Sequence, residues 1–130
     1  MSDRYAERLA ALENNTLDPA DFSHQDHVGV AYLAIERYGV FDALSVFARG
    51  LKSLTARAGV PEKFNATITM ASMSLIAERA ATDEFENADA FLKANGELLS
   101  KSFLTSQYDR DRLSSPLARA VPLLPKSQAA

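Results

Sequence analysis

The segment 41-FDALSVFARGLKSL-54 decides the fold class of this chain. Its large apolar residues recur every three or four positions, a spacing that places side chains on one face of an α-helix. These residues are Phe41, Leu44, Phe47, Leu51 and Leu54. The segments on either side repeat the helical period, and none shows the alternation typical of a β-strand. We therefore predict an all-α fold, a single-domain bundle of about five to six helices.

Capping residues before this segment predict two further helices. Ser2 or Asp3 can cap a first helix, because their short polar side chains accept hydrogen bonds from the amides of a first turn. Ser23 can cap a second helix that runs to about Tyr38. Gly39 suits the C-terminal end of that helix, since glycine readily adopts the left-handed backbone conformation common there.

The chain after the central segment is expected to continue as helices. Pro61 fits the first position of a fourth helix, which extends to about residue 81 and which we expect to be the most buried. A short fifth helix is expected at 88–94, and another helical stretch at 97–108. A single short helix then follows, for which Ser115 would be the N-cap.

Length and composition limit the domain count and the function classes. The 130 residues suit one domain, which we place at 1–125, followed by a flexible C-terminal tail at 126–130. The chain has no cysteine, which excludes disulfides and thiolate chemistry. Its net charge of −3 argues against nucleic-acid binding. No apolar run approaches the roughly 20 residues that span a membrane, and we expect a cytoplasmic protein of a bacterium-like cell.

The two histidines of the chain, His24 and His27, lie three residues apart at the start of the second predicted helix. Residues three apart share a helix face, so the two imidazoles could bind one metal ion, or one of them could act as an acid or base. The same face continues through Val28, Ala31 and Ile35, which places the histidines at the end of a buried stripe. The alternative is a structural role, in which the imidazoles hydrogen-bond to neighbouring backbone or side chains.

Three sequence motifs together resemble an uncharacterised bacterial family of small helical proteins. The first, 22-FSHQDHVGVAYLAIERYG-39, is similar to the family pattern Phe-x-His-x-x-His-(Leu/Val)-x-x-Ala. The second, 64-FNATITMASMSLI-76, matches in part an aromatic-His-Glu-Thr-(Ile/Leu)-Thr motif. The third, 107-QYDRDRLSSPLARAVPLLP-125, is similar to a C-terminal pattern of tyrosine, leucine, serine and Ala-Arg. The resemblance covers about residues 20–125 and implies an architecture and a polar site rather than an activity.

The resemblance implies a polar cluster built from all three motifs. Its members in this chain would be His24, His27, Asn65, Thr67, Tyr108, Ser115 and Arg119. Asn65 and Ala66 stand where the family motif has histidine and glutamate, and a neutral amide is a poor ligand for a transition metal. We therefore expect no metal and no cofactor, and His24 and His27 are weak metal-ligand candidates.

Two function classes remain open. We expect a small-ligand-binding or interaction domain, whose inter-helix polar pocket around His24 and His27 holds a small polar or anionic ligand. The alternative is a small enzyme that uses the histidine cluster for acid–base or metal-assisted chemistry. A homodimer could form through the apolar face of the first helix, which carries Tyr5, Leu9 and Leu12, although the same face could equally cover the core.

Overall fold

The structure confirms the all-α prediction. It is a computed structural model that describes residues 3–99 and 102–125, and within these residues it contains helices and no strand. The α-helices are α1 Arg4–Glu13, α2 His24–Tyr38, α3 Val40–Arg57, α4 Ala66–Thr82, α5 Ala88–Ala94, α6 Ser102–Thr105, α7 Arg110–Leu113 and α8 Pro116–Ala120. The 3-10 helices are η1 Pro19–Asp21, η2 Pro61–Lys63 and η3 Gly96–Leu99. None of these helices is long and apolar enough to cross a membrane. The tail expected at 126–130 lies outside the described residues.

Polar side chains cap the first turns of five of the described α-helices, although not that of the longest, α3. The residues whose side chains cap a first turn are Asp3 for α1, Ser23 for α2, Asn65 for α4, Asn87 for α5 and Ser115 for α8. Each side-chain oxygen accepts a hydrogen bond from an amide that has no partner within its helix. The caps predicted at Asp3, Ser23 and Ser115 are therefore confirmed.

The fourth helix begins later than the sequence predicts. Pro61 starts the short helix η2, and Phe64 then adopts an extended conformation with φ −66° and ψ 131°. α4 begins at Ala66, because the Asn65 side chain accepts the Ile68 amide and caps the helix there. The proline therefore opens a single turn before α4 and not α4 itself.

The C-terminal region is divided into shorter helices than expected. The stretch 97–108 contains η3 and α6 instead of one helix, and an additional turn, α7, precedes the predicted α8. Pro116 has no N–H with which to extend the hydrogen bonding of α7, so it serves as the first residue of a new helix.

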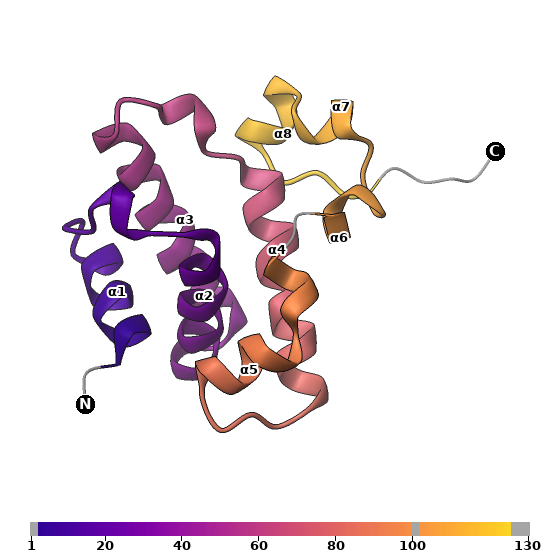
Figure 1. Ribbon diagram of the computed structural model, residues 1–130. Coiled ribbons are helices and arrows are strands. Elements are labelled where there is room, and N and C mark those ends of the chain that lie inside the picture. The colour runs from indigo at the N-terminus through magenta and orange to yellow at the C-terminus, as the bar shows by residue number, and fades with distance from the viewer. Residues whose placement is uncertain (1–2, 100–101, 126–130) are drawn as a thin grey trace.

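α2 lies at the centre of the main bundle. It packs against α1, α3, α4 and α5, and Figure 1 shows α1 and α3 beside it, with α4 alongside and α5 below. Gly39 alone connects α2 to α3 and has φ 81°, a conformation that costs glycine little. Seven residues of α2 are buried, against three of α4. The prediction that the fourth helix is the most buried is therefore wrong, because α4 leaves one side open to the cavity described below.

The apolar face of α1 covers the core. Tyr5, Leu9 and Leu12 are each at most 3% exposed, and they belong to the main apolar cluster together with residues of α2 and α3. The apolar face of α1, which we considered from the sequence as a possible homodimer interface, is therefore buried within one chain.

The segment 104–113 forms a second, smaller apolar cluster beside the first turns of α4. Its buried side chains, Leu104, Tyr108 and Leu113, pack against Ile68 and Ala71 of α4. Figure 1 shows α6, α7 and α8 gathered near one end of α4, away from α1 and α5. The described chain therefore has one main core and one satellite cluster, and α4 contributes residues to both.

Candidate functional site

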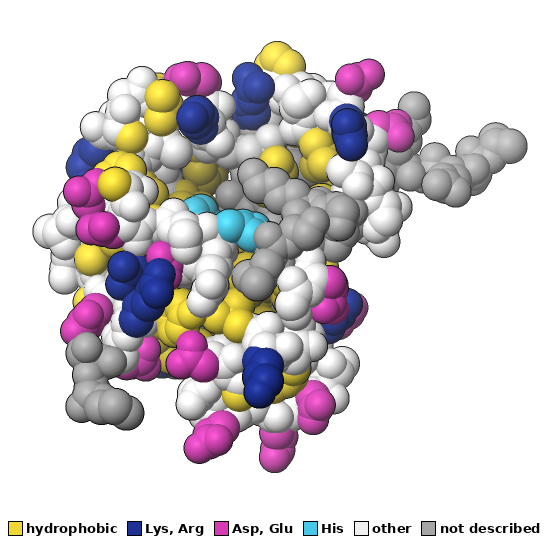
Figure 2. Space-filling view, viewed as in Figure 1, with side chains coloured by type: hydrophobic (Ala, Val, Ile, Leu, Met, Phe, Trp, Pro, Cys, Tyr) yellow, Lys and Arg dark blue, Asp and Glu magenta, His cyan; other side chains and the backbone are white. Residues whose placement is uncertain are grey.

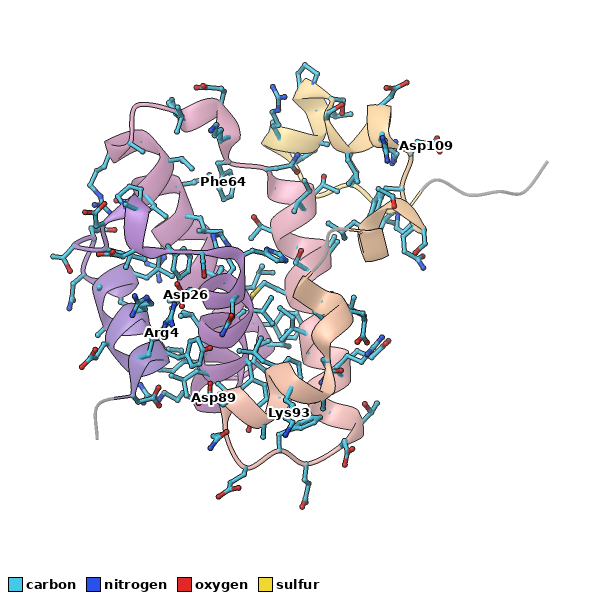
Figure 3. The ribbon with its side chains drawn as sticks, viewed as in Figure 1. Arg4, Asp26, Phe64, Asp89, Lys93 and Asp109 are labelled. Atoms are coloured by element: carbon cyan, nitrogen blue, oxygen red, sulfur yellow. The ribbon has the colours of Figure 1, made fainter. Side chains whose placement is uncertain are left out.

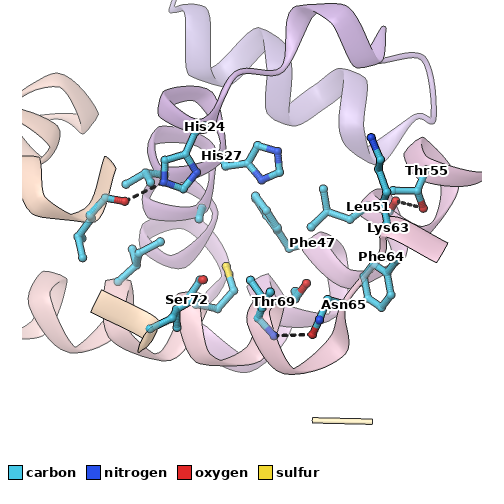
Figure 4. A pocket seen from close by; sticks show the side chains of 17 residues that line it. His24, His27, Phe47, Leu51, Thr55, Lys63, Phe64, Asn65, Thr69 and Ser72 are labelled. Atoms are coloured by element: carbon cyan, nitrogen blue, oxygen red, sulfur yellow. Dashed lines mark hydrogen bonds between the residues drawn. The ribbon is translucent and has the colours of Figure 1, made fainter. Parts of the chain in front are cut away.

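A cavity of about 380 Å³ lies between α2, α3 and α4 (Figure 4). Its apolar lining residues are Val28, Ala31, Phe47, Leu51, Phe64, Ile68, Met73, Ile76, Leu98 and Leu104. Its polar lining residues are His24, His27, Thr55, Lys63, Asn65, Thr69 and Ser72. The wall is thus more apolar than the polar pocket that the sequence led us to expect. We call this cavity the central pocket.

His24 is the first residue of α2, and the Ser23 cap places it at one end of the central pocket. Its Nε2 lies 2.9 Å from the backbone oxygen of Leu98 in η3. Because a carbonyl oxygen can only accept, Nε2 carries the proton, and Nδ1 is the acceptor nitrogen of the neutral ring. His24 therefore has the structural hydrogen bond that the alternative reading of the histidine pair predicted, while its ring still lines the cavity.

His27 lies one helical turn later and points into an aromatic cluster. Its ring centroid is 4.2 Å from that of Phe22 and 6.3 Å from that of Phe47, which is in edge-on orientation. The centroids of His24 and His27 are 6.4 Å apart. Both residues are half-buried, and Figure 2 shows both imidazoles reaching the surface between hydrophobic side chains. The two rings therefore form one polar edge of a mainly apolar cavity.

Asp26 lies between the two histidines in sequence but belongs to the contact between α2 and α1. It is 1% exposed, and its carboxylate accepts hydrogen bonds from Arg4 Nε at 2.9 Å and Arg4 Nη2 at 3.2 Å, a pair labelled in Figure 3. Arg8 Nε lies 3.4 Å from the same carboxylate. The Ser23 amide and hydroxyl also donate to it, both at 3.0 Å. The chain thus neutralises this carboxylate on the side of α2 that faces α1.

The pKa of the Asp26 carboxyl reflects these contacts. Burial raises it, but the hydrogen bonds from Arg4 and Ser23 and the charge of Arg4 outweigh burial, and the pKa lies below its usual value. Asp26 is therefore ionised at neutral pH and paired with arginine, which leaves it no proton to exchange in the central pocket.

Asn65 forms hydrogen bonds to backbone atoms at both ends of its side-chain amide. Its Oδ1 accepts the Ile68 amide at 2.9 Å, and its Nδ2 donates to the Leu113 oxygen at 2.7 Å. These two bonds cap α4 and fasten α7 to it. Asn65 thus lines the central pocket while both ends of its amide group have backbone partners, and the nearby hydroxyls of Thr69 and Ser72 add polar atoms to the same wall.

The opposite wall and rim contribute a cation and no carboxylate. Lys63, from η2, is exposed and lines the central pocket, as does Thr55 of α3. Lys52 lies close by, with its Nζ 5.4 Å from the centroid of the Phe64 ring. Among the lining residues that the structure describes there is no aspartate or glutamate. The formal charge of the described lining is therefore positive.

The other predicted site residues lie outside the central pocket and hold the C-terminal segment. Thr67 is fully buried, and its hydroxyl oxygen lies 2.9 Å from the carbonyl oxygens of both Ala118 and Val121, which share its single proton. The same oxygen accepts the Leu123 amide at 2.9 Å. The Tyr108 hydroxyl donates to the Leu123 oxygen at 2.9 Å. These bonds tie an extended stretch of backbone to α4.

Burial raises the pKa of the Tyr108 phenol, and the charge of Arg112 opposes this rise. Tyr108 therefore remains protonated at neutral pH and serves as a hydrogen-bond donor. Ser115 caps α8, and Arg119 is exposed on that helix. The seven predicted site residues thus divide into three that line the central pocket and four that do not.

Sequence reasoning missed most of the central pocket. Phe47 and Leu51 were assigned to a helix stripe, and nothing in the stripe distinguishes a side chain that fills the core from one that borders a cavity. Thr69 follows Asn65 by four residues and Ser72 follows Thr69 by three, spacings that place all three on one face of a helix that begins at Ala66. Nothing in the sequence around Lys63 indicates that this residue borders a cavity.

No three histidine, cysteine, aspartate or glutamate side chains come together to hold a metal ion within the described part of the chain. Comparison with protein-family models, with curated proteins and with solved structures found no match to this chain.

Proposed function

We propose that this protein binds a small molecule in the central pocket, with an apolar body and one polar group. The observation that carries the proposal is the cavity of about 380 Å³, whose mainly apolar lining also contains histidine, lysine, amide and hydroxyl side chains. Small-molecule sites have this composition and span roughly 300–1,000 Å³. The volume lies at the small end of that range, which favours a compact ligand.

The apolar wall supplies the affinity in this proposal. Phe47 and Met73 are at most 3% exposed and line the central pocket at its inner side. Burial of roughly 150 Å² of apolar ligand surface contributes about 4 kcal/mol at about 25 cal/mol per Å². Binding also costs several kcal/mol or more, because the ligand loses translational and rotational freedom. We therefore expect weak to moderate affinity for a simple chain and tighter binding for a ligand that also satisfies the polar edge.

The test is a titration of the protein with octanol, followed in its amide NMR spectrum. We expect saturable shifts at residues around the cavity, such as Leu51 and Thr69. Ser72→Phe places an aromatic ring in the cavity and should weaken binding at least about tenfold. Ser45→Phe is the matched control, because Ser45 is exposed on α3 and does not line the central pocket.

The result is read together with the stability of each variant. If Ser72→Phe unfolds, the milder Thr69→Leu takes its place in the same titration. Equal binding by the wild type and by a folded pocket-filling variant would reject the central pocket as the site. We also expect the ligand to be recovered chemically unchanged, since a converted ligand would assign the chain to the enzyme class instead.

A further inference from the structure

The central pocket has an asymmetry of charge that its apolar wall does not explain. The chain as a whole carries a net charge of −3, yet Lys63 is among the described lining residues and no aspartate or glutamate is. The nearest acidic residue in sequence to the histidines, Asp26, is turned to α1 and neutralised by Arg4 and Arg8. An acidic protein thus presents a cationic and neutral surface to whatever enters this cavity.

The polar groups of the cavity are suited to bind a negatively charged group of a ligand. Figure 4 shows His27 and Lys63 on one side of the central pocket and Asn65 and Thr69 on the other, with Phe47 between them. His24 lies at the N-terminal end of the fifteen-residue helix α2, the end at which the helix dipole is positive. The ammonium group of Lys63 can donate hydrogen bonds to an anion.

A second cation lies close to the rim. Lys52 of α3 projects over the Phe64 ring, with 5.4 Å between its Nζ and the ring centroid, and Phe64 lines the central pocket. Attraction between a cation and the face of an aromatic ring favours this position of the ammonium group. Lys52 and Lys63 therefore add positive potential at the same end of the cavity, beside Phe64.

We infer that the natural ligand of the central pocket is a small amphipathic carboxylate, with its apolar chain against Phe47 and Met73 and its carboxylate at the Lys63 side. This inference rests on the proposed function and narrows it to one class of ligand. A ligand with a cationic head group would be repelled by Lys52 and Lys63, and an uncharged head group would gain no attraction from their positive charge. A single carboxylate matches the one formal charge of the described lining.

The test compares three probes that share an eight-carbon chain and differ in charge: octanoate, octanol and octylammonium. At neutral pH and low salt we expect octanoate to bind about five- to tenfold more tightly than octanol, and octylammonium to bind most weakly. The preference for octanoate should shrink as sodium chloride is raised, because salt screens exposed charges.

Variants of Lys52 and Lys63, the two lysines at the rim of the central pocket, separate the contribution of charge to binding from that of shape. Lys63→Met keeps the length of the side chain and should lower octanoate affinity about fivefold while leaving octanol affinity within about twofold. Lys52→Met combined with Lys63→Met should remove the preference altogether. Lys93→Met is the control, since Lys93 is exposed on α5 and lies far from Phe64 in Figure 3.

The outcomes distinguish this inference from the proposed function. If octanol and octanoate bind equally and both are excluded by Ser72→Phe, the ligand class is wrong and the binding site stands. Tighter binding of octylammonium would likewise overturn the carboxylate assignment. If none of the three probes binds, the proposed function fails and the inference fails with it. Loss of octanoate binding in Lys93→Met would show that the preference arises from overall charge and not from the rim.

Discussion

At the scale of single residues, the first turn of α2 is held by Asp26. The Asp26 carboxylate accepts from the Ser23 amide while the Ser23 hydroxyl accepts from the Asp26 amide at 3.1 Å, which is a reciprocal capping box. The same carboxylate receives the Arg4 guanidinium from α1. One buried side chain thus determines both where α2 begins and how α1 is attached to it, and through α2 it places His24 and His27.

Replacement of Asp26 by asparagine should therefore destabilise the protein at neutral pH. We expect Asp26→Asn to lower the free energy of unfolding by about 1–3 kcal/mol, the usual cost of breaking a buried charged hydrogen bond. The folded-state pKa of Asp26 is depressed, so its stabilisation is fully present above the unfolded pKa of about 3.9 and is lost as the pH falls through the folded pKa. The difference between wild type and variant should accordingly shrink below about pH 4 in urea unfolding experiments.

Asp109→Asn is the matched control for this experiment. Asp109 is exposed and precedes α7 without a side-chain hydrogen bond to its first turn, so its replacement should change stability by less than about 0.5 kcal/mol. A difference between wild type and Asp26→Asn that stayed constant from pH 7 to pH 2 would contradict the role of the Asp26 charge.

The residue scale also shows how far the sequence predicts the site. The positions of His24 and His27 follow from the Ser23 cap, and their helical spacing places them together, so this half of the site could be predicted. Thr67 and Tyr108 could not be placed, because their partners are backbone atoms about fifteen or more positions away. Backbone partners leave no residue-specific pattern in a sequence.

At the scale of helices, α1 lies unusually close to its neighbours. A Cβ atom added at Gly50 of α3 would lie 2.5 Å from Cγ of Leu12, and one added at Gly29 of α2 would meet the Tyr5 ring. Glycine at these two positions is therefore explained by the close approach of α1. The sequence predicted α1 and its apolar face but left open whether that face met another chain, since a glycine inside a helix signals neither the partner nor the distance.

Gly50→Ala tests this close approach. Alanine favours a helix over glycine by about 1 kcal/mol, but overpacking of a filled core costs about 1–3 kcal/mol. Because Leu12 is 1% exposed and has little room to move, we expect a net loss of about 1 kcal/mol in urea unfolding. In a Leu12→Ala background the same change should become neutral or stabilising.

Gly96→Ala serves as the control, because no atom lies within 4 Å of a Cβ added at that position. Its effect on stability should be small. If Gly50→Ala stabilised the wild-type protein, α1 would not be seated as closely as the structure places it.

Some helix boundaries can be predicted from the sequence and others cannot. α2 and α5 begin at the predicted residues, His24 and Ala88, since the signals for these starts are local. The start of α4 differs from the prediction because Pro61 and Asn65 both suit a helix start, and the helix begins after Asn65, whose side chain accepts the Ile68 amide. The same side chain also donates to the Leu113 oxygen, a tertiary contact that the sequence does not reveal.

At the scale of the whole molecule, the chain has two apolar clusters of unequal size. The main cluster joins α1, α2, α3 and α5 to part of α4, whereas the satellite cluster holds Leu104, Tyr108 and Leu113 against α4. The segment 121–124, which follows the satellite cluster in the chain, is not helical. Side chains hold its backbone by hydrogen bonds. Thr67 and Tyr108 bind the backbone of Leu123, and Arg112 donates to the Leu124 oxygen at 2.9 Å. Few buried apolar contacts are typical of a region that opens before the main core.

Native-state hydrogen exchange should therefore show two levels of protection. The Leu123 amide, which donates to Thr67 Oγ1, should exchange through a smaller opening than the amide of Ala34, a fully buried residue of α2. Thr67→Val keeps the shape of the side chain and removes its hydroxyl, so it should lower the opening free energy at Leu123 by about 1–2 kcal/mol. Thr16→Val, at an exposed residue after α1, should leave Leu123 unchanged. If Thr67→Val lowered protection at Ala34 as much as at Leu123, the two clusters would unfold as one unit, and the central pocket would depend on the C-terminal segment for its stability.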